Sequence, residues 1–218
     1  MTRKIPINTV EEAIHSRRSI RRYANTTVPP EVVDRIVDSA RAAPSPSNTQ
    51  PIRIFLCESP SSRAIIRDAI ESGKKRFLIA ASSVSESAKA ARYIEYYHRY
   101  SVFACDAPLL FIIATVAVIP TDSFSKRLGS FGIIGDDTRG NTDIDLSAGM
   151  AAQNMLLCAQ SLGIGCCALT APLVFAGDLG GKLGLGETRI VAFVSAGYPA
   201  ESPPSAGRLP LSETFRVI

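Results

Sequence analysis

Apolar residues recur every three or four positions along much of the chain, which is the period of an amphipathic α-helix. The pattern from Val32 to Ala40 shows this period directly after the Pro29-Pro30 pair, where a helix can begin. A Thr9-x-x-Glu12 spacing is typical of a capping box at the start of another helix. The helices predicted from these patterns cover about 9–17, 31–42, 60–81, 87–103 and 145–162.

Shorter apolar stretches predict β-strands between the helices. Ile52, Ile54 and Leu56 alternate with other residues, as in a strand with one buried face. The stretch from Leu109 to Ala117 is apolar at almost every position and predicts a fully buried strand. The predicted strands cover about 52–56, 109–117, 165–169 and 189–196. Strands separated by long helices favour one layered domain of helices and strands, and 218 residues suffice for its core.

Three segments have a less regular pattern. Ile119 to Asn141 mixes charged residues and glycines without a clear period, which predicts a loop or a mobile lid. Asp178 to Leu185 is rich in glycine and predicts a short, broken helix. Asp145 to Leu162 is small or apolar on every side, so this helix is predicted to be buried, either centrally or against a partner subunit.

Composition and charge exclude several classes of protein. A net charge of +4 is too mild to predict nucleic acid as a partner, although it suits a small anionic ligand. Five cysteines without a CxxC spacing, and no signal-peptide pattern, predict reduced thiols in a cytoplasmic protein. The longest uncharged run, Ala107 to Thr121, is shorter than the roughly 20 residues of a membrane span, so no membrane association is predicted.

The segment Arg17-Arg18-Ser19-Ile20-Arg21-Arg22 holds four arginines in six residues. Taken alone, such a run is typical of a solvated basic face, or of a nucleic-acid or targeting patch. It is also suited to an anion site, because guanidinium groups match phosphate oxygens and a serine hydroxyl adds a donor. In an extended chain, Arg17, Ser19 and Arg21 would point to the same side, and Arg22 would stay in water.

The loop from Ala42 to Pro51 reads AAPSPSNTQP and joins a predicted helix to a predicted strand. It holds more prolines and polar residues than a plain connection needs. One interpretation is a rigid link in which Asn48 and Gln50 only satisfy backbone groups. The other is a platform with fixed φ angles that presents donors and acceptors to a flat heterocycle. The loop by itself does not decide between them.

Two further motifs favour packing over chemistry. The turn from Gly163 to Pro172 lacks the GxGxxG spacing of a dinucleotide-binding loop. Cys166 and Cys167 are adjacent on a predicted strand and so point to opposite faces, which favours two core thiols over a redox pair. The tyrosines between Tyr93 and Tyr100 suit the wall of a substrate site, but such spacing on a helix is more often packing.

Taken together, four motifs resemble the FMN-dependent nitroreductase family. They are RRSIRRY, APSPSNTQP, AAQNMLLCAQSLGIG and GRLPL, in this order along the chain. The resemblance implies an α+β fold, with a central, mostly antiparallel sheet flanked by helices, in a homodimer that binds FMN at the subunit interface. It implies a single FMN-binding domain over residues 1–218, in which about 60–140 would form a lid or substrate region.

The resemblance also assigns roles to individual residues. Arg17 and Ser19 would hold the FMN phosphate, Arg18 would support them, Arg208 would complete the clamp, and Arg21 would lie near the pyrimidine edge. Residues of the 42–51 loop would reach the flavin from the partner subunit, and the start of the segment after residue 169 would lie beside flavin N5. The implied cofactor-binding residues are Arg17, Arg18, Ser19, Arg21, Pro44, Ser45, Pro46, Asn48, Thr170, Ala171 and Arg208.

The function that the resemblance implies is an NAD(P)H:acceptor oxidoreductase that reduces nitro, quinone or activated-alkene compounds in two half-reactions. No catalytic side chain and no metal ligand is assigned, because the flavin carries the chemistry. The chain departs from the family pattern at Ile52-Arg53, Thr170-Ala171 and Ala206-Gly207. These departures keep open a flavin enzyme without NAD(P)H turnover, acting in dehalogenation, flavin cleavage or azoline oxidation. A non-catalytic basic binding module is the third hypothesis.

Overall fold

The computed structural model describes residues 10–116, 128–133 and 142–218. At its centre lies a four-stranded sheet with the order β1-β2-β4-β3, in which all three neighbouring pairs are antiparallel. The strands are β1 (Ile52–Leu56), β2 (Leu109–Val116), β3 (Gly165–Leu169) and β4 (Thr188–Gly197). All four were predicted from the apolar pattern, with ends that differ by at most one residue.

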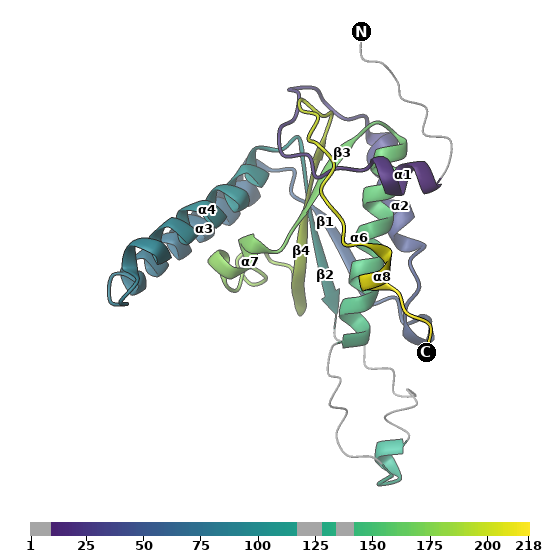
Figure 1. Ribbon diagram of the computed structural model, residues 1–218. Helices are drawn as coiled ribbons and strands as arrows, with labels where there is room; N and C mark the ends of the chain where they lie inside the picture. Colours follow the sequence, from purple (N-terminus) through teal and green to yellow (C-terminus); the bar gives the residue numbers. More distant parts are fainter. Residues whose placement is uncertain (1–9, 117–127, 134–141) are drawn as a thin grey trace.

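Helices surround this sheet (Figure 1). They are α1 (Val10–Ser16), α2 (Pro30–Arg41), α3 (Pro60–Ala81), α4 (Ser87–Val102), α6 (Thr142–Ser161), α7 (Ala171–Ala176) and α8 (Leu211–Thr214), with the short 3-10 helices η1 (Pro46–Asn48) and η2 (Phe103–Asp106). The five predicted helices are confirmed. The predicted helix over 178–185 is wrong: this stretch forms turns, and the positive φ angle at Gly184 takes its chain out of helical geometry. The predicted loop or lid over 119–141 lies outside the described residues except for 128–133.

Strand β2 explains why the sheet is covered on both sides. Its side chains alternate, so Phe111 and Ile113 enter the core beneath α2 and α6. Leu110 and Ile112 enter the opposite core, beneath the base of α3, η2 and α7. All four side chains are almost completely buried. The antiparallel sheet between two helical layers confirms the predicted α+β fold class.

Helix α6 is buried on one face only within the chain. Ser147, Ala151 and Met155 are buried, whereas Leu146 is 62% exposed. The side chains of α6 left exposed or half-exposed recur at helical spacing and include Leu146, Met150, Gln153 and Leu157. Of the two alternatives drawn from the sequence, burial of this helix entirely within its own chain is therefore wrong. Neither α6 nor another helix of the described residues has the length and apolar character needed to cross a membrane.

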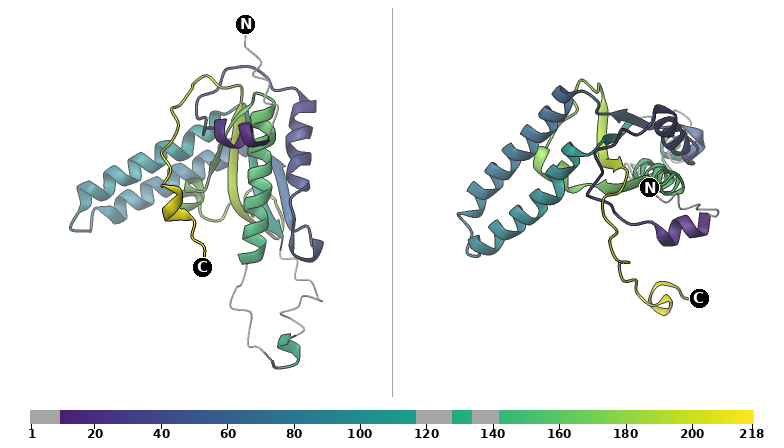
Figure 2. Two further views of the ribbon diagram at one scale, coloured as in Figure 1. Left: turned by 45° about the vertical axis from the view of Figure 1, so that its right-hand side comes forward. Right: turned by 90° about the horizontal axis from the view of Figure 1, so that it is seen from above.

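Helices α3 and α4 form an antiparallel hairpin that projects from one side of the sheet (Figures 1 and 2). A hydrogen bond of 2.9 Å joins His98 Nε2 to Glu71 Oε1, and Lys74 forms an ion pair with Glu95. The hairpin rests on α7, which α3 approaches very closely at Gly73. The position of α7 therefore depends on the packing of this hairpin.

Candidate functional site

The arginine segment follows α1 and runs alongside β3. Ser19 pairs with Cys166 in a parallel bridge, and the Ile20 N–H donates to the Cys166 carbonyl at 3.0 Å. The backbone is thus extended here, which is the condition under which Arg17, Ser19 and Arg21 would point to the same side. Gly165 permits this approach, because a Cβ at that position would lie 2.6 Å from Ile20 Cγ1. Pairing with the edge strand β3, which Gly165 permits, therefore fixes the direction in which the arginine segment runs.

The chain that leaves β4 holds the segment from the other side. Oε1 of Glu201 accepts the backbone N–H groups of Arg21 at 2.5 Å and of Arg22 at 3.1 Å. The Ala200 N–H donates to the Arg22 carbonyl at 2.9 Å. One carboxylate therefore fixes the backbone of two arginines without pairing with either guanidinium. The sequence analysis did not identify Glu201, since a single acid in a Pro- and Ser-rich tail carries no recognisable signal.

Tyr23 anchors the end of the segment to the sheet. Its hydroxyl donates to the Ile20 carbonyl at 2.5 Å and lies 2.8 Å from Ser195 Oγ on β4. Burial raises the pKa of Tyr23 above its ordinary value of 10.0. The folded state therefore holds this proton more tightly than the unfolded chain does, and the stability that depends on it is lost as the pH rises above 10.

Replacing Tyr23 by phenylalanine is expected to lower the free energy of unfolding at pH 7 by about 1 kcal/mol, because the Ser195 hydroxyl and the Ile20 carbonyl lose a partner. Above pH 10 the loss should shrink, since the variant has no phenol to deprotonate. Urea unfolding of both proteins across this pH range measures the difference. The control is Tyr93→Phe on exposed α4, which should leave the free energy of unfolding unchanged at pH 7 and above pH 10. If the free energy lost in Tyr23→Phe stayed constant with pH, the expectation would be contradicted.

The thiols beside the segment are neutral core groups. Cys166 and Cys167 belong to opposite cores of the sheet and are both buried and free, which confirms that they are not a bonded pair. Burial raises the pKa of Cys166 to about 12, and burial likewise raises the pKa of Cys167. Against the larger effect of burial, the nearby Arg17 lowers the pKa of Cys166, and Arg21 and Ser19 lower the pKa of Cys167. Arg17, Ser19 and Arg21, which would share one side of an extended chain, thus all lie near the thiols of β3.

The guanidinium groups differ in what they contact. Arg18 donates to the carbonyls of His15 and Arg17 at 2.8 Å each, so it closes the end of α1. The Arg21 guanidinium carbon lies 5.2 Å from the centre of the Tyr100 ring on α4. No ion pair among the described residues involves Arg17 or Arg21. Two cationic groups near β3 therefore remain without a neutralising acid in the part of the chain that the structure describes.

The 42–51 loop lies elsewhere. It precedes β1 near the N-terminal end of α6, whereas α1 contacts the C-terminal end of α6 through Gln160 and Ser16 (Figure 1). A helix of the length of α6, 20 residues, extends roughly 30 Å. One chain therefore does not bring Pro44, Ser45, Pro46 and Asn48 to its own arginine segment.

The loop nevertheless has an unusual backbone. Ser47, Asn48 and Gln50 all have φ angles near +50°, in the left-handed region that non-glycine residues rarely adopt. The Ser45 hydroxyl accepts the Gln50 N–H at 2.9 Å, and the Gln50 side-chain amide donates to Asn48 Oδ1 at 3.3 Å. Strain of this kind persists only where the surroundings hold it, and it often marks a ligand contact.

The remaining predicted residues lie at two places. Thr170 follows the end of β3 and Ala171 begins α7, four and five residues after Cys166. Arg208 lies in an exposed tail, where its guanidinium donates to the carbonyls of Ala206 and Gly207. The tail leaves the body of the chain after β4 (Figure 2). The structure therefore brings Arg17, Ser19 and Arg21 together along β3, but it leaves Arg208 apart from them.

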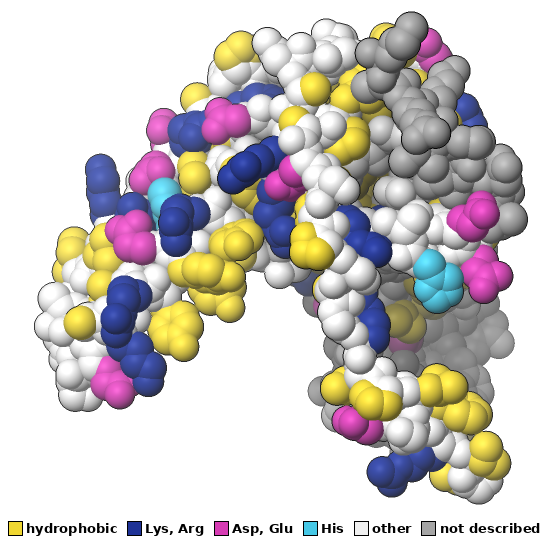
Figure 3. Space-filling view, turned by 45° about the horizontal axis from the view of Figure 1, so that its top comes forward, with side chains coloured by type: hydrophobic (Ala, Val, Ile, Leu, Met, Phe, Trp, Pro, Cys, Tyr) yellow, Lys and Arg dark blue, Asp and Glu magenta, His cyan; other side chains and the backbone are white. Residues whose placement is uncertain are grey.

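A space-filling view shows where these elements meet (Figure 3). Lys and Arg side chains gather in a hollow between the helical hairpin and the C-terminal tail, and apolar side chains border the hollow on both sides. Apolar residues of the tail and of α1 are exposed, among them Val10, Leu209, Leu211 and Phe215. A large apolar border around a basic hollow is typical of a surface that a partner or ligand covers.

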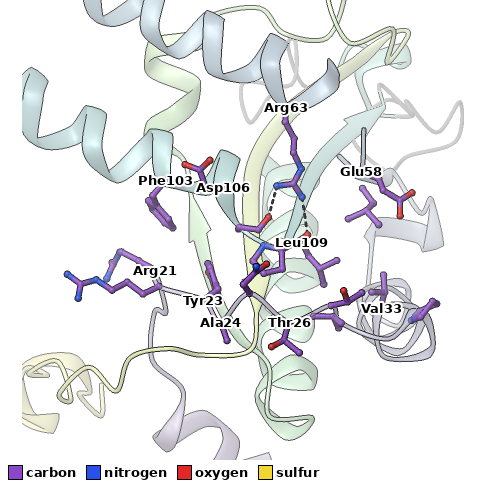
Figure 4. Close-up of a pocket in the computed structure, with 18 of the residues that line it drawn as sticks. Arg21, Tyr23, Ala24, Thr26, Val33, Glu58, Arg63, Phe103, Asp106 and Leu109 are labelled. Carbon is purple, nitrogen blue, oxygen red and sulfur yellow. Dashed lines mark hydrogen bonds between the residues drawn. The ribbon is translucent and has the colours of Figure 1, made fainter. Parts of the chain in front are cut away.

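A separate cavity of about 900 Å³ lies at the end of the sheet where β1 stops and β2 starts (Figure 4). It shares Arg21 and Arg22 with the arginine segment. Arg63 on its wall donates to four carbonyls, those of Cys57, Cys105, Ala107 and Pro108, and so ties α3 to both strands. This guanidinium is fully used by the backbone, and the cavity is a less suitable anion site than the edge of β3. No group of three or more potential metal ligands occurs among the described residues.

Known proteins similar to this chain share its length and its fold to different degrees. A protein of Methanothermobacter thermautotrophicus, named for NADH dehydrogenase and NAD(P)H nitroreductase activity, is 27% identical over 156 residues. The match covers 72% of this chain and 58% of that protein, so the chain spans less than two thirds of it. Iodotyrosine deiodinase of Hydra vulgaris is 24% identical over 209 residues, covering 92% of this chain and 70% of that protein.

Among solved structures, a BluB-like flavoprotein from Clostridium difficile 630 superposes with a TM-score of 0.80. It is 26% identical, and the match covers 96% of this chain and 99% of that one. This likeness agrees with the antiparallel sheet and its helical layers. The model of the nitroreductase family matches residues 14–198, which include the arginine segment, the 42–51 loop and all four strands. The chain therefore belongs to the nitroreductase family.

Proposed function

We propose that this chain is an FMN-dependent NAD(P)H:acceptor oxidoreductase that reduces nitro, quinone or activated-alkene compounds. The observation that carries the proposal is the arginine segment beside β3. It combines two guanidinium groups, which form no ion pair with any residue that the structure describes, with the Ser19 hydroxyl, on a backbone fixed by Cys166 and Glu201. Such a donor set fits a phosphomonoester, whose oxygens accept charge-assisted hydrogen bonds.

Each of the predicted residues would contact a different part of the flavin. Arg17 and Ser19 would hold the phosphate, and Arg18 would support them by fixing the end of α1. Arg21 would face the pyrimidine edge, further along the same strand. Thr170 and Ala171, where β3 meets α7, would lie beside flavin N5. Arg208 would join the phosphate only after the exposed tail has moved toward the arginine segment.

A second copy of the chain would supply the rest of the site. The platform of Pro44, Ser45, Pro46 and Asn48 lies about one helix length from the arginine segment of its own chain, so it is better placed to serve a partner. The half-exposed apolar face of α6 supports a homodimer, because such a face is stable when another surface covers it. The α3–α4 hairpin, within the predicted 60–140 region, would then border the acceptor site.

Bound FMN would supply the redox chemistry, taking a hydride from NAD(P)H and passing two electrons to the acceptor. For a quinone the balance is NAD(P)H + H⁺ + quinone → NAD(P)⁺ + hydroquinone. The chain contributes binding and electrostatics. Arg21 would stabilise the negative charge that develops near the pyrimidine edge, and the stiff loop would order few additional groups on binding. No side chain is assigned as a proton donor, so the one proton in this balance would come from water.

The purified protein is expected to be yellow, and NAD(P)H should bleach it in the absence of oxygen. Reoxidation by menadione should restore the colour, because both half-reactions use one flavin. Visible absorbance spectra before and after each addition measure this. A colourless protein that FMN cannot reconstitute would exclude the proposed function.

A second candidate keeps the flavin but not the nicotinamide step. It is supported by the similarity to an iodotyrosine deiodinase along 92% of this chain. A halogenated or otherwise flavin-activated substrate would then be transformed at the same site, with electrons from another donor. Stopped-flow mixing with NADH and with NADPH separates the two candidates. Slow reduction by both nicotinamides, together with rapid oxidation of chemically reduced protein by an iodophenol, would favour the second.

A further inference from the structure

We propose that the tyrosine row of α4, formed by Tyr93, Tyr96, Tyr97 and Tyr100, is the wall that binds the electron acceptor, and that it selects flat aromatic acceptors with a negative charge. The inference rests on the proposed function, because it takes the arginine segment as the flavin site. It goes beyond that function by naming a substrate class and the surface that recognises it.

The row lies on one side of the helix. Its members are spaced three and four residues apart, which places them on the same face. Tyr93, Tyr96 and Tyr97 are 58%, 45% and 51% exposed. The buried His98 lies on the opposite side of α4, where it bonds to Glu71 of α3. The tyrosines therefore do not form the packing surface that the spacing alone favours.

The rings are arranged as a continuous aromatic surface. The Tyr96 and Tyr97 rings meet edge to face at 5.3 Å, and the Tyr96 and Tyr100 rings are tilted at 4.8 Å. A hydrogen bond to Tyr100 raises the pKa of Tyr96, whose phenol is neutral at pH 7 even at the ordinary value of 10.0. Neutral phenols offer ring faces for stacking and hydroxyl groups for hydrogen bonds. Both suit a planar aromatic ligand with polar substituents.

The row begins at the candidate flavin site. Arg21 stacks on Tyr100 at 5.2 Å, and Glu201 fixes the backbone of Arg21. From Tyr100 to Tyr93 the helix rises roughly 10 Å, about the length of a two-ring aromatic molecule. An acceptor bound along the row would thus have one end beside Arg21, the residue assigned to the reduced flavin.

The charges around the row favour an anion. Arg92 and Arg99 are exposed on the same helix, and no ion pair among the described residues involves either of them. Glu95, the acid between them, is paired with Lys74 at 2.9 Å. With Arg21 at one end, the row is bordered by three cations without an acid partner. A carboxylate or sulfonate on the acceptor would complement this field.

The first two-electron step on a suitable probe is balanced as 4-nitrobenzoate + NAD(P)H + H⁺ → 4-nitrosobenzoate + NAD(P)⁺ + H₂O. The uncharged 4-nitrobenzamide has the same ring and nitro group. Comparing the two probes separates recognition of the ring from recognition of the charge. The test uses the FMN-loaded protein and two double variants, Tyr96→Ser with Tyr97→Ser, and Arg92→Gln with Arg99→Gln.

Loss of the two rings is expected to raise KM for both probes about tenfold, through lost stacking, while NAD(P)H still reduces the flavin. Loss of the two arginines is expected to lower kcat/KM for 4-nitrobenzoate by about threefold to tenfold and to leave 4-nitrobenzamide unchanged. Ile79→Ser on α3, at a position that is 73% exposed, is the matched control and should change neither KM.

Calorimetric titration with 4-nitrobenzoate gives a second readout that does not depend on turnover. The dissociation constant should rise about tenfold in the tyrosine double variant. An unchanged KM and dissociation constant would overturn the proposal. So would conversion of a dimer into a monomer by the same variant, because the row would then be an interface between two copies. A protein that neither retains FMN nor accepts hydride would instead exclude the proposed function, and the titration would still test the row.

Discussion

Replacing Arg17 and Arg208 together by alanine is expected to weaken FMN binding by a factor of about 10²–10⁴. A charge-assisted hydrogen bond contributes about 1.5–3 kcal/mol, and 1.4 kcal/mol corresponds to a tenfold change in affinity. Neither guanidinium has an ion-pair partner among the described residues, so alanine leaves no buried acid unpaired. The loss should therefore appear in cofactor affinity and not in the stability of the apoprotein.

Titration of apoprotein with FMN, followed by flavin fluorescence, measures the effect. The control is Arg35→Ala with Arg41→Ala on exposed positions of α2, which removes the same charge and should leave the affinity unchanged within about twofold. The single variant Arg208→Ala is informative as well. If it alone weakens binding, the tail must reach the phosphate when FMN is bound. A double variant that stays yellow through dialysis would show that the arginine segment is not the phosphate site.

Replacing Gly73 by alanine is expected to lower the free energy of unfolding by about 3 kcal/mol, although alanine is the better helix former. A Cβ at this position would lie 1.9 Å from the Phe175 carbonyl oxygen, and its two next contacts are also backbone atoms of Phe175. A backbone cannot rotate away as a side chain can. The gain of about 0.5–1 kcal/mol in helix propensity is therefore smaller than the cost of separating α3 from α7.

Urea unfolding of the two proteins gives the difference in stability. Ser72→Ala, one position earlier and exposed on the same helix, serves as the control and should be neutral or slightly stabilising. Displacement of α7 would also move Thr170 and Ala171, so the flavin absorbance of Gly73→Ala protein should shift if these residues border the ring. Unchanged stability would mean that α3 and α7 lie further apart than the structure places them.

The secondary structure of this chain could be predicted almost completely from its sequence. Long helices such as α3 repeat their apolar residues often enough for the period to be clear. The continuous apolar run of β2 predicted burial on both faces, and Phe111 and Leu110 do enter opposite cores. The short helices α7 and α8 were not predicted, and the 178–185 stretch was predicted wrongly, because its glycines form turns that no side-chain pattern records.

The candidate site was predicted in part. An extended backbone for the Arg17–Arg22 segment was considered from the sequence but not predicted, and the segment does run along β3. Glu201 and Tyr23 hold this segment. Tyr23 ends the RRSIRRY motif but was given no role, and Glu201 belongs to no recognisable motif. Tyr100 was considered together with its neighbours, but its contact with Arg21 joins residues that are 79 positions apart in the sequence. Contacts of this kind depend on how helices and strands pack together, and the spacing of neighbouring residues in the sequence does not predict that packing.

The sequence by itself determined which segments become helices and strands, because hydrophobic periodicity and turn residues act over a few positions. It also carried the ordered motifs by which the family was recognised. Only the tertiary structure decided that the arginine segment lies on β3, that the 42–51 loop lies a helix length away, and that the α4 tyrosines face outward. These are consequences of which surfaces exclude water against one another, and that choice is made by the whole chain at once.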